Sequence, residues 1–502
     1  MRQIPVMMIT ALTVGILSAA QEPGISEAAQ QSRTLPMEAR RLTTVDVVKA
    51  GADPAGLVLS TAPIQSAIDH VAAGGGGEVI VPKGVYRVTA LVLKSGVTLR
   101  LEEGAVLRPS RDSADYVGQL PTVGAEGATN IAVIGKGVIE GGGDCFYQPT
   151  GKPMRNKRPQ YVIHFNRCKG VLIEDVTLRH SMLWTCRLTV CEQVVIRGVT
   201  IRNRSAAVQH YSDGIDLVCC SSVLIEKCDI ETGDDGICLK SELDKTVPRE
   251  QHPVMTNIVV RDCVIATTCN ATKIGTETIG DINDVLFERI TVRKHREPEG
   301  KTAVPSGVCV AAISLQSNDG AKVRNITCRD YTIEDCYAPV FIQLQDRDSH
   351  RPSDIGALGD IVIERLTCAR ALDASQINVS EGGRLGKITL ADFDVRTQGK
   401  GIVKPRTPGR PKGGYPDAHK NGVMPAFGLF ARDVDGLELR GKMTFKDEGG
   451  SGREAVVLEG MPGATMSAEA AKIKPVADAK PASANDPSTP QKINNGEVSR
   501  QR

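Results

Sequence analysis

The chain has 502 residues, of which 41% are hydrophobic and 24% are charged, and its formal net charge is +2. This near-neutral balance, together with the absence of any Lys/Arg run, argues against nucleic acid as a partner. A local basic groove for an acidic glycan would not change the total. Aromatic residues make up only 3%, so few side chains are available to stack on sugar rings.

The N-terminus has the features of a secretory signal peptide. Arg2 gives it a basic start, an apolar run extends from Val6 to Ala20, and small residues precede a plausible cleavage site. The run is too short to span a bilayer comfortably, and no other membrane segment is evident. We therefore predict a signal peptide at 1–20, a polar spacer at 21–42, and a secreted or periplasmic protein.

One short pattern of alternating apolar residues recurs through the middle of the chain. β-Branched residues and a period of two favour strands over helices. The first spacings are 23, 29, 35 and 27 residues, as expected when coils of fixed strand content carry loops of varying length. A leucine-rich repeat array is disfavoured because its Leu-x-x-Leu-x-Leu pattern is absent. The copies begin at Val171, Val194, Val223, Ile258, Val285, Ile361 and, more weakly, Ile388.

These repeats predict an all-β fold, a single-domain right-handed parallel β-helix over 43–450. The segment Ile64–Val71 is amphipathic with a helical period, so we expect it to cap the N-terminal end of the solenoid. Residues 451–502 are rich in Ala, Lys, Pro, Ser and Asn, which predicts a flexible tail.

The fourteen cysteines show no spacing typical of zinc. Cys228 and Cys263 occupy the same phase of successive repeats, where small apolar side chains fill the core. Disulfides stay open, because an exported chain permits them. We expect no cofactor and no metal.

Asp213 and Asp235 lie 22 residues apart inside two near-copies, Ser212–Leu217 and Asp234–Leu239. On adjacent coils, equivalent positions lie about 4.8 Å apart. Three carboxylates, those of Asp213, Asp234 and Asp235, would then share one patch. Mutual repulsion raises at least one pKa, so that an acid and a base coexist at neutral pH. Glycosidases use such an arrangement.

Several segments resemble the polygalacturonase family, glycoside hydrolase family 28. They include Gly74–Gly77, Val81–Tyr86, Gly135–Gly141, Ser181–Trp184, Ser212–Asp216 and Gly233–Ser241, the last close to Gly-Asp-Asp-x-Ile-x-x-Lys-Ser. The resemblance spans about residues 43–400. It implies a metal-independent, inverting hydrolase of a pectin-like or other acidic polysaccharide. It also implies that Asp234 is the general acid and that Asp213 and Asp235 activate water.

Two family motifs are missing. Thr268–Glu277 matches the family's next coil but lacks the His of Gly-His-Gly. The place of Arg-Ile-Lys, one coil later, is near Ile313–Gln316 and has no cation. Such cations hold carboxylates. Lys273 is the nearest replacement, and alternation with the core residue Ile274 turns it outward.

We expect Lys240, Lys273 and Glu277 to bind substrate, while Asp216 bonds locally and Trp184, the single Trp, packs. Two alternatives stay open: a β-eliminating polysaccharide lyase and a non-catalytic glycan-binding protein on the same fold. We expect a monomer whose partner is a polysaccharide or oligosaccharide. Specificity should depend on the inserted loops 144–158, 242–253, 294–306 and 345–358.

Overall fold

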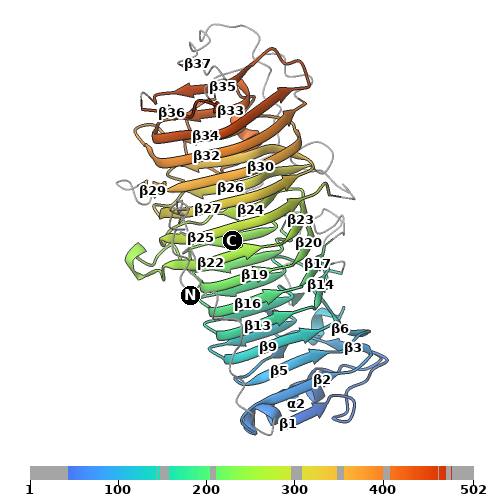
Figure 1. Ribbon diagram of the computed structural model, residues 1–502. Coiled ribbons are helices and arrows are strands. Elements are labelled where there is room, and N and C mark those ends of the chain that lie inside the picture. The colour runs from blue at the N-terminus through green and yellow to red at the C-terminus, as the bar shows by residue number, and fades with distance from the viewer. Residues whose placement is uncertain are drawn as a thin grey trace, which may run out of the picture.

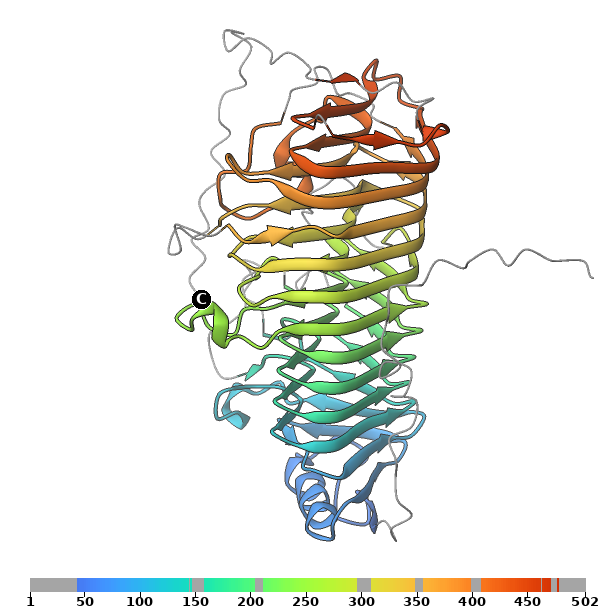
Figure 2. The same ribbon diagram turned by 60° about the vertical axis from the view of Figure 1, so that its left-hand side comes forward.

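The computed structural model describes residues 43–143, 145–146, 158–203, 211–295, 308–347, 355–398, 408–461, 463–470 and 476–477. Parallel strands wind into one elongated solenoid, with helix α2 at one end and β33 and β35 at the other (Figures 1 and 2). The predicted signal peptide and spacer lie outside the described residues. Within the described part, no helix combines the length and apolarity that crossing a membrane requires.

Three faces run along the solenoid, each a column of parallel strands. We name them faces A, B and C. Face A contains the strands that pair successively as β1 (Thr43–Asp46), β2 (Gly77–Val81), β5 (Val97–Leu101), β9 (Thr129–Gly135), β13 (Lys169–Glu174), β16 (Glu192–Arg197), β19 (Ser221–Glu226), β22 (Met255–Arg261), β25 (Ile282–Val292), β27 (Lys322–Ile333), β30 (Ile361–Ala371), β32 (Leu385–Thr397), β34 (Val434–Asp447) and β36 (Thr465–Met466), with β29 (Ala357–Leu358) beside β27.

The other two faces complete each coil. Face B contains β3 (Gly84–Val88), β6 (Ala105–Pro109), β10 (Val138–Glu140), β14 (Thr177–Arg179), β17 (Thr200–Arg202), β20 (Asp229–Thr232) and β23 (Val264–Thr267), which joins the end of β25. Face C contains β4 (Leu91–Val92), β8 (Val123–Glu126), β12 (Ile163–Asn166), β15 (Cys186–Thr189), β18 (Ile215–Val218), β21 (Ile237–Lys240), β24 (Asn270–Ile274), β26 (Cys309–Ser317), β28 (Cys336–Leu344), β31 (Ser375–Val379), β33 (Ala426–Arg432), β35 (Glu454–Glu459) and β37 (Val476–Ala477).

Short elements lie outside these columns. The pair β7 (Gln119–Leu120) and β11 (Arg158–Pro159) forms a separate two-stranded sheet. Among the described residues, the 3-10 helices η1 (Ser113–Asp115), η3 (Arg249–Gln251) and η5 (Ala418–Asn421) occur in connections between strands.

The repeat predicted from the sequence is the pairing register of face A. Val171, Val194 and Val223 stack on one another, and the series continues through Ile258 and Val285. All of these side chains belong to one continuous apolar core. The parallel β-helix is thereby confirmed. The sequence pattern missed one coil: β27 is a further copy of the repeat, between the copies that begin at 285 and 361.

The N-terminal cap is also confirmed. Helix α2 (Thr61–Ala73) buries Ile64, Ala67, Ile68 and Val71 in the same core as the strands. Without this helix, the apolar interior of the first coil would be exposed to water, which is why an end cap is needed.

At the other end, the solenoid extends past the boundary at 450 that composition predicts. Strand β35 pairs with β33, and its Val456, Val457 and Leu458 are buried. A short apolar run is enough to add a strand where a preceding coil already offers a paired edge. From residue 478 onward the predicted tail lies outside the described residues.

All fourteen cysteines are described, and none forms a disulfide. Cys228 and Cys263 are buried in the continuous core, as their phase in the repeat predicts.

Candidate active site

The carboxylates of Asp213, Asp234 and Asp235 come together on face C, just before β18 and β21. Ile215 of β18 pairs with Ile237 of β21, and the Gly214 N–H donates to the Asp235 carbonyl at 2.8 Å. The offset of 22 residues therefore does stack Asp213 beside Asp235. Asp213 and Asp235 are 3% and 2% exposed, whereas Asp234 is half-buried.

Glycine after each aspartate allows the coils to approach this closely. A Cβ at Gly214 would lie 2.4 Å from the carbonyl oxygen of Gly236, and one at Gly236 would lie 2.6 Å from that of Ala271. No other residue fits without moving backbone. The Asp-Gly repeat thus fixes the spacing of the carboxylates.

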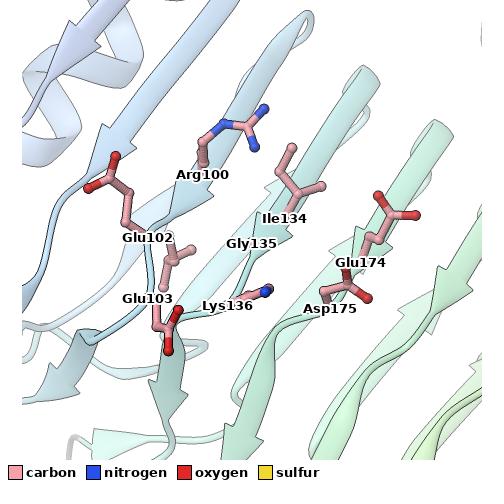
Figure 3. Close-up of a pocket in the computed structure, with 9 residues that line it drawn as sticks. Arg100, Glu102, Glu103, Ile134, Gly135, Lys136, Glu174 and Asp175 are labelled. Atoms are coloured by element: carbon pink, nitrogen blue, oxygen red, sulfur yellow. The ribbon is translucent and has the colours of Figure 1, made fainter.

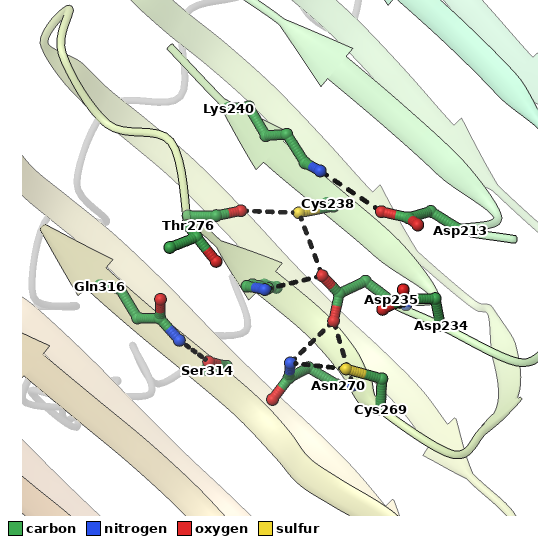
Figure 4. A network of polar contacts seen from close by, with 12 residues as sticks. Asp213, Asp234, Asp235, Cys238, Lys240, Cys269, Asn270, Thr276, Ser314 and Gln316 are labelled. Atoms are coloured by element: carbon green, nitrogen blue, oxygen red, sulfur yellow. Dashed lines mark hydrogen bonds and ion pairs between the residues drawn. The ribbon is translucent and has the colours of Figure 1, made fainter. Parts of the chain in front are cut away.

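Two buried lysines neutralise part of this charge, and Figure 4 shows Lys240 directed at Asp213. Lys273 Nζ lies 2.7 Å from Asp235 Oδ2, and Lys240 Nζ lies 3.3 Å from Asp213 Oδ2 and 3.2 Å from Asp216 Oδ1. Alternation in β24 turns Lys273 outward while Ile274 enters the core, as predicted. Burial of both partners makes each pair a fixed part of the site.

The pKa values of the adjacent aspartates are displaced in opposite directions. Burial would raise the pKa of Asp235, but Lys273, Lys240 and the amide of Asn270 outweigh it and lower that pKa. Asn270 Nδ2 donates to Asp235 Oδ1 at 2.7 Å. Burial, followed by repulsion from Asp213 and Asp235, raises the pKa of Asp234 well above its ordinary value. These surroundings thus favour the charged form of Asp235 and the protonated form of Asp234.

Asp213 and Asp216 share the charge of Lys240. Burial and then repulsion from Asp216 raise the pKa of Asp213. Burial likewise raises the pKa of Asp216 to about 6, against the pull of Lys240. The sequence pattern placed Asp216 in a local hydrogen bond, and it missed this buried pair. The signal was the i, i+3 spacing of two acids around one strand start.

Glu277 follows β24 and keeps 32% of its side chain exposed. Its carboxylate lies 3.6 Å from Lys240 and 3.4 Å from Arg347. Burial would raise its pKa, but Lys240 and Arg347 lower it to about 2, so Glu277 is charged at all ordinary pH values. Arg347 comes from 70 residues away, and no local motif predicts it.

The two lysines stand upstream of the coil where the resemblance would put cations. Ser314 of β26 stacks directly on Lys273, and Gln316 lies two residues further along the same strand. Both are buried. The nearest positive charge to these positions is that of Lys273, one coil toward the N-terminus, where it contacts the carboxylate of Asp235.

On the N-terminal side of the carboxylates, Arg187 of β15 pairs in register with Asp216. Its Nη1 donates to the Tyr161 hydroxyl at 2.8 Å, and its guanidinium lies 4.9 Å from the Trp184 ring centroid. Lys240 Nζ also lies over the Trp184 ring, 3.7 Å from its centroid. Among the described residues, no carboxylate lies within 4.0 Å of Arg187, which is partly exposed. Trp184 therefore packs between two cations, beyond the simple packing predicted.

Asp234, Asp235 and Cys269 each bring one potential ligand atom within 4.8 Å of the others. Because Lys273 already neutralises Asp235, this cluster has little negative charge to offer a cation. The same distance bounds the nearest approach of the Asp234 and Asp235 oxygens.

A separate hollow of about 340 Å³ lies on face A, lined by Arg100, Glu103, Lys136 and Asp175 (Figure 3). Arg100 pairs there with Glu78. None of its residues belongs to the carboxylate cluster on face C.

Comparisons with known proteins identify the family of the chain. The family model "Glycosyl hydrolases family 28" matches residues 75–332, just over half of the chain. A probable polygalacturonase of Vitis vinifera is 26% identical over 272 residues, 50% of this chain and 55% of the relative. An exopolygalacturonase of Cochliobolus carbonum is 24% identical over 371 residues, 67% of this chain and 78% of the relative. The chain spans about half the length of the Vitis relative and of an exo-poly-alpha-D-galacturonosidase of Dickeya chrysanthemi.

Solved structures share the fold. An exopolygalacturonase from Thermotoga maritima superposes with a TM-score of 0.59 at 20% identity, covering 74% of this chain and 91% of the other. A polygalacturonase from Erwinia carotovora superposes with a TM-score of 0.56 at 18% identity, covering 72% and 96%. The family model matches just over half of this chain, and the Asp-Gly carboxylate pair is built as the family's motifs imply. The chain therefore belongs to glycosyl hydrolases family 28.

Proposed function

We propose that the protein hydrolyses glycosidic bonds in a pectin-like or other acidic polysaccharide, with Asp234 as general acid and Asp235, assisted by Asp213, as the base that activates water. The observation that carries the proposal is that Lys273 and Asn270 both bind the Asp235 carboxylate beside Asp234, in a member of family 28, so that the pKa values of the two adjacent aspartates shift in opposite directions. A protonated acid beside a charged base is what glycoside hydrolysis requires.

In this mechanism Asp234 donates its proton to the leaving oxygen of the scissile bond. Its partial exposure allows contact with substrate. Asp235 accepts a proton from water, and Lys273 and Asn270 hold its carboxylate in place. Asp213 stacks beside it on the preceding coil and, as the family resemblance implies, helps to activate the same water, whose oxygen bonds to the anomeric carbon as the bond to the leaving oxygen breaks. The family resemblance favours inversion of the anomeric carbon.

We assign different roles to the three substrate-binding candidates. Lys240 and Lys273 are buried against carboxylates, so we propose that they position Asp213 and Asp235 and set their charge. Glu277 keeps an exposed edge, which can accept hydrogen bonds from sugar hydroxyls.

The preference for an acidic glycan rests on Arg187. It is a partly exposed guanidinium without a carboxylate partner in the described part of the chain, one coil from Asp216. A guanidinium fixed beside an aromatic ring is well suited to bind a planar carboxylate. It offers the cation that Ser314 and Gln316 cannot.

The test is a substrate panel containing polygalacturonate, rhamnogalacturonan and neutral plant and algal glycans. New reducing ends without absorbance from unsaturated uronate are the expected result. Absorbance that grows with the reducing ends would identify a lyase. Binding of a glycan without any cleavage would favour a non-catalytic role. Export and the monomeric state remain predictions, to be checked by N-terminal sequencing of the mature protein and by sedimentation.

A further inference from the structure

We infer that the substrate cleft is closed immediately C-terminal to Asp235, so that the enzyme releases short products from a chain end instead of cutting internally. The inference rests on the proposed hydrolase function. It concerns how a polymer can lie along face C, where the carboxylates stand.

The first observation is a column of outward-facing side chains that are nevertheless buried. Continuing from Lys273, the pairing register of face C runs through Ser314, Phe341 and Gln376. The neighbouring column runs from Gln316 through Gln343 to Asn378. An open groove would leave these side chains in water. Their exposed fractions are instead all 2% or less: Ser314, Gln316, Phe341, Gln343, Gln376 and Asn378.

The chain covers this column itself. The segment 408–425, which we call the strap, lies between β32 and β33 in sequence. Asn421 donates to Gln343 Oε1 at 3.3 Å and to Gln376 Oε1 at 3.2 Å. Gln345 and Asn378 donate to the backbone carbonyls of Gly414 and Gly409, at 3.0 and 3.2 Å. A row of amides thus ties the strap to two successive coils, those of β28 and β31.

An apolar contact fastens the middle of the strap. Ala418 is buried in a cluster with Phe341, Val310 and Ala338, separate from the main core. Amide pairing and apolar burial together leave no room for a sugar chain above β26, β28 and β31.

The inner end of the strap reaches the active site. The Lys273 ammonium that pairs with Asp235 also donates to the Tyr415 hydroxyl at 3.1 Å. It lies 5.2 Å from the centre of the Tyr415 ring, while Lys420 lies 4.8 Å from that centre on the strap itself. Tyr415 therefore forms the wall at which the cleft ends.

Toward the N-terminus, the outward-facing side chains of face C remain in contact with solvent. His164, Trp184 and Arg187 are all partly exposed, and His164 and Arg187 pair in register on adjacent coils. Coils repeat about every 4.8 Å, close to the length of one sugar unit. A glycan can thus extend from the carboxylates toward Arg187, with its cut end against Tyr415.

Product analysis tests the closure. Wild type acting on an end-labelled galacturonate hexamer should yield only mono- or disaccharide at the earliest times, and viscosity of polygalacturonate should fall far more slowly than reducing ends appear. Early products of mixed length would overturn the closed end while leaving the hydrolase intact. Tyr415→Ala should lengthen the first products, whereas Tyr415→Phe, which keeps the ring, should not. Unchanged product lengths in Tyr415→Ala would contradict the assignment of the wall.

A second readout does not depend on turnover. Gln343→Cys should react with a charged maleimide at least about tenfold more slowly than Val117→Cys, an 83% exposed control, because the strap must open first. Peptide mapping separates these thiols from the native cysteines. Equal rates would overturn the closure even if no glycan were cleaved, and an absence of cleavage with slow labelling would instead fault the hydrolase proposal.

Discussion

At the scale of single residues, the proposed chemistry depends on two aspartates that are neighbours in sequence but have different surroundings. Lys273 and Asn270 stabilise the charged form of Asp235, whereas burial and two nearby carboxylates favour the protonated form of Asp234. The two residues are consecutive, so a single peptide bond joins them. Their environments, set by side chains 35 to 38 residues away, make the difference.

The first prediction is a bell-shaped pH profile. The active form has Asp235 charged and Asp234 protonated. Because the pKa of Asp235 is lowered, kcat/KM should fall on the acid side only below the usual range of an aspartate. Because the pKa of Asp234 is raised, activity should be lost on the alkaline side well above that range. Initial rates of reducing-end release from pH 2 to 9 measure both limbs.

Lys273→Met provides the matched variant for this profile. Without its ammonium, Asp235 loses the main influence that lowers its pKa, so the acid limb should move to higher pH. Removing one partner of a buried pair should also cost about 3–5 kcal/mol of unfolding free energy. An acid limb that stays in place would show that Asp235 is not the base.

A second prediction concerns Arg187. Arg187→Ala should lower kcat/KM on polygalacturonate by about 10- to 100-fold, the equivalent of one charge-assisted contact, and leave carboxyl-reduced substrate unaffected. Arg187→Lys should recover only part of the loss, since an ammonium lacks the planar fork. Equal losses on both substrates would mean that Arg187 merely supports Trp184 and Tyr161.

A third prediction concerns the anomer of the first product. Family resemblance favours inversion, although the nearest oxygens of Asp234 and Asp235, within 4.8 Å, are closer than the roughly 6.5–9.5 Å typical of inverting pairs. Proton NMR during early turnover reads the anomer before mutarotation. A retained anomer would make one of these aspartates a nucleophile.

At the scale of elements, face C positions the site and helix α2 protects the core. The fourth prediction is that Ile68→Ala costs about 2–5 kcal/mol of unfolding free energy, because it opens a cavity between α2 and the first coils. Val58→Ala, at a 59% exposed position, is the control and should be nearly neutral. Urea unfolding measures both, and equal small effects would show that the cap does not stabilise the solenoid.

The elements also show what the sequence could predict. Strands, stacking register and the α2 cap follow from local periodicity, because each coil repeats the same alternation. The carboxylate trio follows from the Asp-Gly copies. Arg347 and Tyr415 could not be found that way, since both lie in loops whose lengths differ from coil to coil. The strap has no repeat signal for the same reason.

At the scale of the whole molecule, stacking explains how one site is assembled from distant segments. Strands β15, β18, β21 and β24 bring Arg187, Asp213, Asp235 and Lys273 together on one face. A solenoid of this kind places chemistry along its axis, which suits a linear polymer. The strap then limits how far that polymer extends.

The most direct test of the central claim is the Asp dependence of cleavage. Asp234→Asn and Asp235→Asn should each lower reducing-end release by at least about 100-fold while the protein stays folded. Asp435→Asn, which alters a 59% exposed carboxylate on face A, should retain full activity. Wild-type rates in either site variant, from a protein that unfolds cooperatively like the control, would contradict the assignment of these two carboxylates as acid and base.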